Sequence, residues 1–421
     1  MKRSALIPLP LAGCLLLSGC GILSDGGEVT LDLVAADYGT NDSNSSSIYW
    51  NKVAKDFEAA NSGIKVHVDV VSWDDIDKHV AELIAKGDTP DIVQTGGFVD
   101  QVAADRLYPV GDVLSMEAQA NLLDSFNKAG QVLGSQYGIP FISSSRAFVY
   151  NKAIFERAGI GAPPTTWEEL RKDAELIKTK VPGVTPYALP LGPEEAQAES
   201  MIWTMSGGGA ISDSVGNYTI DSQQNRDTFK WLRTNLVDKG LTYPDPGTVN
   251  RKAAFTAFAK GEVAMLNGHP ALLKDAAAAG IQYGIAPIPL KSTKEAKPVA
   301  FGVADWLMAF KANGHRTEIK KFLNFALSKQ NTLEFDEEYN MLPVTQDTLT
   351  EMKDNPQHQD LTQFLDNLPS ANFYPYGAPS WDKVSSLIKQ RIGGAVKSGG
   401  DQVLGDLQSD ATAESNRARQ G

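Results

Sequence analysis

The chain has 421 residues, and its 51 acidic residues outnumber the 39 basic ones to give a formal net charge of −12 at neutral pH. This acidic balance argues against nucleic acid as a partner, because phosphates are bound by clustered lysines and arginines and the sequence contains no such cluster. The length exceeds what one hydrophobic core usually serves, so two domains are expected.

The N-terminus has the layout of a bacterial export signal. Two basic residues precede an apolar run over residues 5–17, which is shorter than the roughly 20 residues that a membrane span needs and contains two prolines. The run ends in the sequence Leu-Ser-Gly-Cys, which resembles a lipoprotein signal. That resemblance implies that residues 1–19 are removed and that lipid is attached to Cys20.

The resemblance to lipoproteins also implies where the protein resides. Several acyl chains on Cys20 would hold the protein at its membrane more firmly than a single chain does. We therefore expect a cell-membrane location, lipid-anchored on the extracytoplasmic side, with residues 20–27 as anchor and linker. A second match to the motif ends at Cys14, which stays an alternative lipidation site.

After the linker, the apolar pattern predicts alternating strands and helices. Alternation indicates strands near residues 29–33, 64–70 and 91–93, and helical spacing indicates helices near 50–57 and 76–84. The order strand, helix, strand, helix, strand predicts a parallel sheet. Ligands of such sheets lie beyond the carboxyl ends of the strands. The loops at these ends are residues 36–39, 72–75 and 94–97.

A second α/β region begins near residue 147. Thr166 and Glu169 have the spacing of a capping box at the start of a helix. Further strand-like segments follow, separated by helical stretches: residues 148–150, 262–266, 283–288 and 306–310. The last segment is mostly helical, and the polar tail over residues 399–421 is expected to form a terminal helix with a frayed end.

Six segments together resemble one family, the extracellular solute-binding proteins of bacterial ATP-driven importers, in particular the large sugar-binding class that includes maltose-binding proteins. The resemblance covers nearly the whole chain after the signal. The segments are DFEAANSGIKVHV at 56–68, GDTPDIVQTGG at 87–97, YGIPFISSSRAFVYNKAIFERAGI at 137–160, PPTTWEEL at 163–170, AFAKGEVAMLNGHP at 257–270 and YGIAPIPL at 283–290.

This resemblance implies a periplasmic-binding-protein-like fold of type II, in which two α/β lobes are joined by multiple crossovers with a ligand cleft between them. The first crossover is expected near residues 139–145, the second near 298–302 and the third near 342–345. The first lobe would then comprise residues 28–139 plus 302–343. The second would comprise residues 146–298 plus 346–398.

The implied function is capture of a mono- or oligosaccharide by closure of the lobes, followed by delivery to a membrane permease. A ligand drives such closure only if it contacts both lobes. The resemblance implies a monomer that needs no cofactor or metal and carries out no catalysis. A permease that recognises the closed form would distinguish the loaded protein from the empty one.

Sugars are bound by aromatic rings beside hydrogen-bonding groups. The resemblance suggests Trp306 and Trp381 as stacking residues, although each is alternatively a core residue. Trp203 precedes a glycine run in which Gly208 would allow close approach of a ligand, or would merely form a turn. Trp73 is left open.

Polar candidates lie in the strand-end loops and near the crossovers. Among them, the Arg146 guanidinium could hold vicinal hydroxyls or take part in a structural ion pair. Asp305 stands where the family often has glycine and could bind hydroxyls. The candidates are Asp37, Tyr38, Thr95, Gly96, Ser144, Ser145, Arg146, Asn267, His269 and Asp305.

Other functions remain to be weighed. No nucleophile elbow, zinc-binding helix motif or phosphate-binding loop is present, which argues against an enzyme, although distant pairs of carboxylates escape such a search. Within the transporter class, a polyamine, a peptide or a glycerol phosphodiester is an alternative ligand. A lipoprotein that binds a macromolecule at the cell surface without transporting it is a further alternative.

Overall fold

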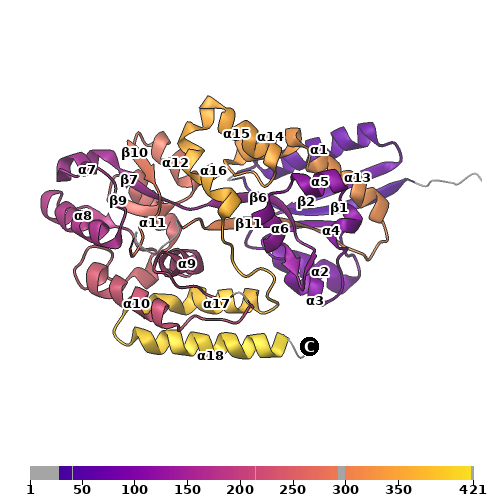
Figure 1. Ribbon diagram of the computed structural model, residues 1–421. Coiled ribbons are helices and arrows are strands. Elements are labelled where there is room, and N and C mark those ends of the chain that lie inside the picture. The colour runs from indigo at the N-terminus through magenta and orange to yellow at the C-terminus, as the bar shows by residue number, and fades with distance from the viewer. Residues whose placement is uncertain (1–27, 40, 214, 293–298, 419–421) are drawn as a thin grey trace, which may run out of the picture.

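The computed structural model describes residues 28–39, 41–213, 215–292 and 299–418. The predictions for the signal, for Cys14 and Cys20 as lipidation sites and for the linker over residues 20–27 lie outside these residues. Figure 1 shows two lobes side by side, joined by strands that run between them. In the described part of the chain no helix is both long and apolar enough to cross a membrane.

The first lobe is built on a five-stranded sheet with the order β2-β1-β3-β11-β6. β1 pairs in parallel with β2 and β3, which confirms the predicted parallel unit, whereas β11 is antiparallel to both of its neighbours. The strands are β1 (Val29–Ala36), β2 (Ile64–Val71), β3 (Ile92–Thr95), β6 (Ile139–Ser145) and β11 (Gly302–Ala309).

Helices cover this sheet because their apolar faces are buried against it. In α1 (Ser46–Ala60), Trp50, Val53 and Phe57 are buried, and the Ser45 side chain caps the helix by accepting from the backbone N–H of Ser47. The other elements of this lobe are α2 (Ile76–Lys86), α3 (Val99–Ala103), α4 (Val110–Val113), α5 (Met116–Asn121), α6 (Asp124–Ala129), the hairpin strands β4 (Gln131–Val132) and β5 (Ser135–Gln136), α13 (Arg316–Ala326), α14 (Lys329–Tyr339) and α15 (Gln346–Asp354).

The second lobe is built on a four-stranded sheet with the order β10-β7-β9-β8. Its helices surround this sheet on the left of Figure 1. The strands are β7 (Ala147–Asn151), β8 (Thr185–Tyr187), β9 (Val263–Gly268) and β10 (Tyr283–Ala286). The helices are α7 (Lys152–Ala158), α8 (Trp167–Lys180), α9 (Ala196–Ser206), α10 (Gln223–Leu232) with its extension Arg233–Val237, the short helix Pro246–Thr248, α11 (Arg251–Ala259) and α12 (Pro270–Ala278).

The chain passes from the first sheet to the second at Arg146, which lies between β6 and β7. The return passage leads into β11, where the backbone N–H of Arg146 donates to the carbonyl oxygen of Phe301 at 3.0 Å. The two crossing segments therefore lie side by side.

The third passage comes later than the predicted boundary. α15 still contacts first-lobe elements, since Asn121 donates to Asp347 at 2.8 Å and Lys329 pairs with Glu351. Helix α17 packs against α9 and α18 and so belongs to the second lobe. The connecting elements are the short helix Pro356–Leu361, α16 (Thr362–Asn367) and the short helix Leu368–Ser370, and the second lobe ends with α17 (Trp381–Arg391), the short helix Ile392–Val396 and α18 (Gly400–Ala418).

The predicted terminal helix is present as α18, but it is not only a polar tail. Leu404, Leu407 and Ala411 are buried against α17 and its neighbours. The apolar spacing of these residues is helical, and it fixes the C-terminal helix along the edge of the second lobe in Figure 1.

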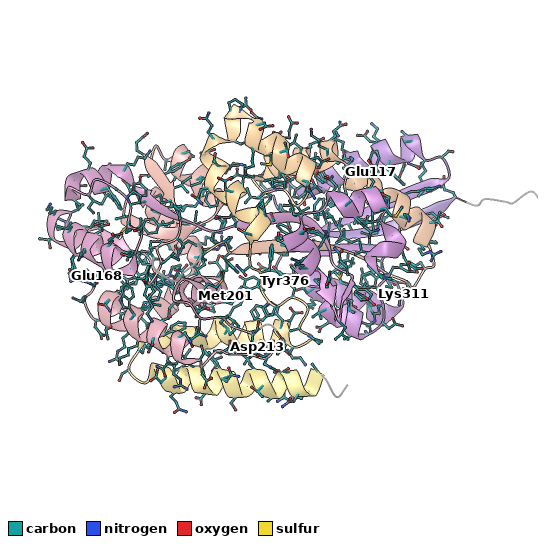
Figure 2. The ribbon with its side chains drawn as sticks, in the orientation of Figure 1. Glu117, Glu168, Met201, Asp213, Lys311 and Tyr376 are labelled. Atoms are coloured by element: carbon teal, nitrogen blue, oxygen red, sulfur yellow. The ribbon has the colours of Figure 1, made fainter. Side chains whose placement is uncertain are left out.

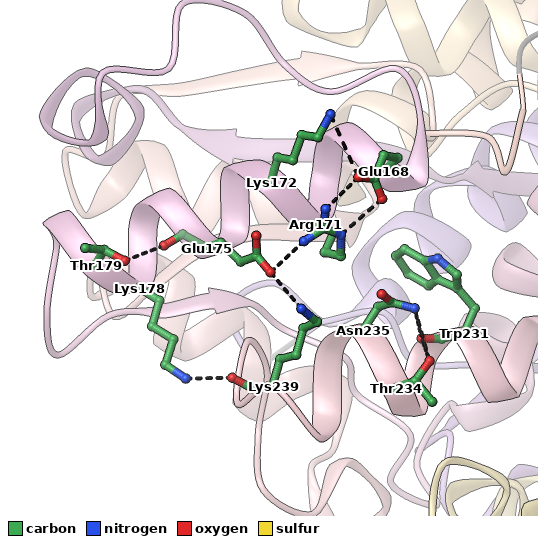
Figure 3. A network of polar contacts seen from close by, with 10 residues as sticks. All are labelled: Glu168, Arg171, Lys172, Glu175, Lys178, Thr179, Trp231, Thr234, Asn235 and Lys239. Carbon is green, nitrogen blue, oxygen red and sulfur yellow. Dashed lines mark hydrogen bonds and ion pairs between the residues drawn. The ribbon is translucent and has the colours of Figure 1, made fainter.

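Helix α8 shows how side chains fix an element of the second lobe. The predicted capping box is confirmed, because Thr166 accepts from the backbone N–H of Glu169 and Glu169 reciprocates. On the outer face, Arg171 donates to Glu168 and Glu175, and Lys239 joins Glu175 at 3.0 Å (Figure 3). These pairs are largely exposed, so each contributes only about 0.2–1 kcal/mol.

Candidate functional site

Three adjacent strands of the first lobe bring together a carboxylate, a phenol and an amide. The Tyr38 hydroxyl donates to Asp305 Oδ2 at 2.7 Å, and Gln94 Nε2 donates to the Tyr38 hydroxyl at 2.9 Å. Burial raises the pKa of Asp305 to about 6, although the bond from Tyr38 acts in the opposite direction. Among the described residues, none is hydrogen-bonded to the second carboxylate oxygen, Oδ1.

The direction of Asp305 depends on an irregularity in β11. The register with β6 shifts between Asp305 and Trp306. A bulge of this kind re-aims a side chain relative to the regular alternation of a strand. Asp305 is half-buried, while Trp306 has no exposed surface.

Trp73 lies beside this group and is 40% exposed. Its ring meets the ring of Tyr38 edge to face, with centroids 5.3 Å apart. A Cβ atom at Gly96 would lie 3.7 Å from both the Trp73 ring and Asp305 Oδ1. An exposed indole and a carboxylate oxygen therefore border one position, which glycine leaves free of a side chain.

Two other first-lobe candidates have internal partners. The Asp37 carboxylate accepts from the backbone N–H groups of Gly39 and Ser46 and so closes the loop before α1. Thr95 is 5% exposed, and its hydroxyl donates to Asp77 at 2.9 Å. Asp37 and Thr95 therefore lie next to the site, where their side chains are bonded to other protein groups.

The second lobe presents a ladder of alternating charges. Glu195 pairs with both Arg146 and Arg251 at 2.5 Å, and Arg251 also reaches Glu194 at 2.7 Å. The Arg146 guanidinium donates to Ser144 at 2.9 Å. Burial alone would raise the pKa of Glu195, but the two guanidinium groups hold it below its usual value. The ion-pair interpretation of Arg146 is therefore confirmed.

A second buried carboxylate, Glu199, lies next to this ladder. Its Oε1 atom accepts hydrogen bonds from Trp203 at 2.8 Å, Tyr187 at 3.0 Å and Asn267 at 3.1 Å. Burial raises the pKa of Glu199 to about 7. One small cavity is lined by both groups, including Arg146, Glu199 and Asn267.

His269 extends the ladder, since its Nε2 atom lies 2.5 Å from the Arg251 guanidinium. Burial, with Arg146 and Arg251 adding to it, holds the pKa of His269 well below its usual value. A neutral ring accepts from Arg251 at this atom. The hydrogen bond from Arg251 therefore fixes the position of the His269 ring.

The three tryptophans predicted to bind the ligand, two of them by stacking, have little or no exposed surface. Trp306 is 0% exposed, and Trp203 and Trp381 are each 3% exposed. Trp306 packs edge to face against Phe98 and Tyr376. These three rings present no free face in this conformation.

Two further candidates do not join the site. Ser145 is fully buried, and its hydroxyl donates to the carbonyl oxygen of Phe364 on the far side of the strand. Gly208 follows α9 with a φ of +82°, and a Cβ atom there would meet nothing within 4 Å. The left-handed conformation explains the glycine as part of a helix end.

Tyr376 lies between the Asp305 group of the first lobe and the Arg146 ion pairs, and the sequence analysis does not identify it as a candidate. Its hydroxyl donates to the carbonyl oxygen of Ala304 at 3.1 Å, and the pKa of Tyr376 responds to both Asp305 and Arg146 after the dominant effect of burial. Figure 2 labels Tyr376 between the lobes. The sequence does contain one indication of a site here, because two tyrosines flank Pro375 in the third passage between the lobes.

The lobes also approach each other at α17. A Cβ atom at Gly97 of the first lobe would lie 3.5 Å from Asp382 Oδ2 of the second. Burial, together with the nearby Asp100 and Asp77, raises the pKa of Asp382 to about 6. Among the described residues no group of three or more acidic, histidine or cysteine side chains could hold a metal ion.

Two α/β lobes, with an exposed indole and buried polar groups at the crossing between them, define a two-lobed binding protein. The chain belongs to the bacterial extracellular solute-binding proteins, since the model of that family matches residues 42–333. Over 412 residues it is 29% identical to a protein of Brucella abortus (strain 2308) that is named only as a binding protein, with 94% of this chain and 97% of the other covered.

Other similarities carry more specific names. The diacetylchitobiose-binding protein DasA of Streptomyces coelicolor is 25% identical over 348 residues, which cover 78% of this chain and 79% of DasA. A cyclic α-maltosyl-1,6-maltose-binding protein of Arthrobacter globiformis has a similar structure, with a TM-score of 0.77 at 19% identity and coverage of 93% and 100%. A solute-binding protein of Thermotoga lettingae bound to α-D-tagatose gives 0.75 at 20% identity, with coverage of 92% and 100%.

These comparisons confirm the predicted fold class and the prediction of a solute-binding protein. The exact bounds of the lobes and the individual site residues stay predictions.

Proposed function

We propose that this protein binds a mono- or oligosaccharide between its lobes and delivers it to the permease of an ABC importer, without catalysis of its own. The observation that carries the proposal is the pairing of the exposed Trp73 ring with the free Oδ1 atom of Asp305. The sugar ligands named for DasA and for the Arthrobacter and Thermotoga proteins support the same ligand class.

The physical fit to a sugar is direct. A sugar ring has an apolar C–H face that packs on an indole and hydroxyl edges that donate to a carboxylate. Trp73 and Asp305 border the same open position, so one sugar unit contacts both. In the opposite lobe, Arg146 and Asn267 are buried and hold internal partners, so the first-lobe pair carries the proposal.

A ligand that carries a phosphate group, such as a glycerol phosphodiester, fits less well. A relative of 26% identity over 259 residues, from Rhizobium meliloti, is named as an sn-glycerol-3-phosphate-binding protein, and this chain covers 58% of its length. A phosphate would need free cationic groups, yet Arg146 and Arg251 are already paired with Glu194 and Glu195.

Replacement of Trp73 by Ala should weaken sugar binding by about ten- to a hundredfold, or about 1.4–2.8 kcal/mol, because the stacking face is removed. Trp73→Phe should retain part of the affinity. Calorimetric titration with a panel of mono- and oligosaccharides, polyamines and peptides measures the effect. Met116→Ala, at an exposed apolar side chain of the same lobe, is the matched control. Binding of polyamines or peptides alone would contradict the sugar assignment.

We also propose that the protein acts as a monomer held at the membrane by lipid on Cys20. A Cys20→Ser change should move the protein from the membrane fraction to the soluble extracytoplasmic fraction, because the thiol that carries the lipid is lost. Fractionation and immunoblotting measure the distribution, with Cys14→Ser as the matched control. Retention of the Cys20 variant at the membrane together with release of the Cys14 variant would assign the lipid to Cys14 instead.

A further inference from the structure

Two carboxylates from opposite lobes border one turn of the first-lobe backbone. Gly96 and Gly97 are consecutive, and a Cβ atom would lie 3.7 Å from Asp305 Oδ1 at the first and 3.5 Å from Asp382 Oδ2 at the second. Both carboxylates also act on one phenol, because burial, followed by the charges of Asp305 and Asp382, raises the pKa of Tyr376. Each lobe therefore contributes one carboxylate to the same region between the lobes.

Neither of these carboxylates has a cation as its partner. Asp305 accepts from the neutral phenol of Tyr38 at 2.7 Å. Asp382 is exposed, and its carboxylate forms no hydrogen bond or ion pair with another side chain in the described ranges. Both negative charges are therefore open to an interaction with a ligand.

The surroundings of Asp382 add to the negative charge. Partial burial, with the charges of Asp100 and Asp77 adding to it, raises the pKa of Asp382 to about 6. Lys389 acts in the opposite direction with a smaller effect than any of these. Acidic groups on both sides of the gap thus create a negative potential that attracts a cation.

The charges of the second-lobe ladder, in contrast, compensate each other. Arg146 and Arg251 pair with Glu194 and Glu195. These four side chains carry two positive and two negative charges, so they add no net charge to the region. The uncompensated charge between the lobes is therefore negative and belongs to the two aspartates.

Closure of the lobes around a neutral sugar would remove these aspartates from water without supplying a counter-ion. Such a transfer is unfavourable for an ionised carboxylate unless opposite charge and hydrogen bonds replace the solvent. A ligand ammonium group supplies the charge and forms charge-assisted hydrogen bonds. It is also attracted to the face of an indole, and Trp73 is 40% exposed beside Asp305.

We infer that the ligand is an amino sugar with a free ammonium group, and that Asp305 and Asp382 select it over its neutral counterparts. The inference rests on the proposed function and deepens it, since the ligand stays a carbohydrate and gains a positive charge. The sugar ring packs on Trp73 while the ammonium group lies in the field of the carboxylates. Because the carboxylates belong to different lobes, this charge also favours the closed arrangement.

The test compares β-1,4-linked disaccharides of glucosamine, N-acetylglucosamine and glucose, which differ in the group at carbon 2 and therefore in charge. The corresponding monosaccharides and their galacto-configured forms repeat the comparison. In calorimetric titrations of the purified protein at neutral pH, the amine should bind at least about tenfold more tightly than either neutral form. This ratio should fall as the salt concentration is raised from about 0.05 to about 0.5 M, because ions screen the attraction.

Two variants test whether the carboxylates cause the selectivity. Asp382→Asn and Asp305→Asn each remove a charge while keeping the size of the side chain, so each should lower the ratio of amine to neutral affinity by about threefold or more. Asp275→Asn is the matched control, because Asp275 is an exposed carboxylate of α12 in the second lobe. This control should keep the ratio of the unaltered protein.

Three outcomes decide between the ideas. A preference for the amine that falls with salt and in both aspartate variants, and persists in Asp275→Asn, supports the inference. Neutral sugars that bind as tightly as the amine, or a preference that persists in both aspartate variants, overturn the inference and leave the proposed function intact. Failure of every sugar to bind the unaltered protein overturns both, as does binding of a polyamine such as spermidine alone.

Discussion

Replacement of Asp305 by Ala is expected to weaken carbohydrate binding by about 2–4 kcal/mol, or roughly 30- to 1,000-fold. The loss is large because Asp305 supplies the one charged group among the described residues that border Gly96. Its Oδ2 atom accepts from Tyr38, whereas its Oδ1 atom has no partner among these residues. Hydrogen bonds from sugar hydroxyls to a charged acceptor are stronger than those between neutral groups. Tyr38 and Gln94 remain bonded to each other in the variant.

The same carboxylate predicts a pH dependence of binding. Burial raises the pKa of Asp305 to about 6, so the acceptor is charged above this pH and increasingly protonated below it. Because hydroxyl donors favour the charged form, affinity should be constant at neutral pH and fall by about tenfold at one pH unit below the pKa. Asp305→Asn should bind more weakly than the unaltered protein at neutral pH and should lose this pH dependence.

Calorimetric titration over a pH series measures both effects. Asp32→Ala is a suitable control, because Asp32 lies in the same sheet and its exposed carboxylate pairs with His67 at the surface. Unchanged affinity in Asp305→Ala, with an unfolding transition like that of the unaltered protein, would remove Asp305 from the ligand site and with it the pairing on which the sugar assignment depends.

The fold could be predicted from the sequence because its signals are local. The alternation in residues 29–33 and 64–70 and the capping box at Thr166 each determine an element without reference to the rest of the chain. The order of these elements then implies a parallel sheet, and Tyr38 and Gly96 follow from the rule that ligands lie beyond the strand ends. Both residues lie beside Asp305 in the candidate site.

The remaining features, which are the role of Trp73, the partner of Arg146 and the position of the third passage, depend on contacts between residues that are distant in sequence. The sequence does not decide the role of Trp73, because its position depends on packing against Tyr38, which is distant in sequence. Arg146 was expected at the hinge, but its partner Glu195 is 49 residues away and becomes adjacent only when α9 packs on the second sheet. The predicted position of the third passage rests on the resemblance alone, and the contacts of α15 with the first lobe lie between residues far apart in sequence, such as Asn121 and Asp347.

Trp306 shows most clearly how a local pattern misleads. It directly follows Asp305, so a regular strand would direct the two side chains to opposite faces. The structure places a register shift between them and buries Trp306 against Phe98, with Gly138 packed so closely that a Cβ atom there would lie 2.8 Å from the indole ring. The ring thus supports the strand that carries Asp305 and does not itself face the ligand in this conformation.

This placement predicts that Trp306→Ala lowers the free energy of unfolding by about 3–5 kcal/mol, since it leaves a large cavity in the core of the first lobe. Trp306→Phe should cost less, because it fills most of the space and removes an indole N–H that has no partner among the described residues. Chemical denaturation followed by fluorescence and circular dichroism measures both variants, with Trp73→Ala as the exposed control.

The pattern of binding and stability separates the two roles of tryptophan. A core role for Trp306 requires that Trp306→Phe bind sugar within a few-fold of the unaltered protein while Trp306→Ala unfolds at a lower denaturant concentration. A stacking role requires the reverse, a loss of affinity in Trp306→Phe with little change in stability. Trp73 should show that reverse pattern, because its ring is exposed beside Asp305 and contributes little to the packed core.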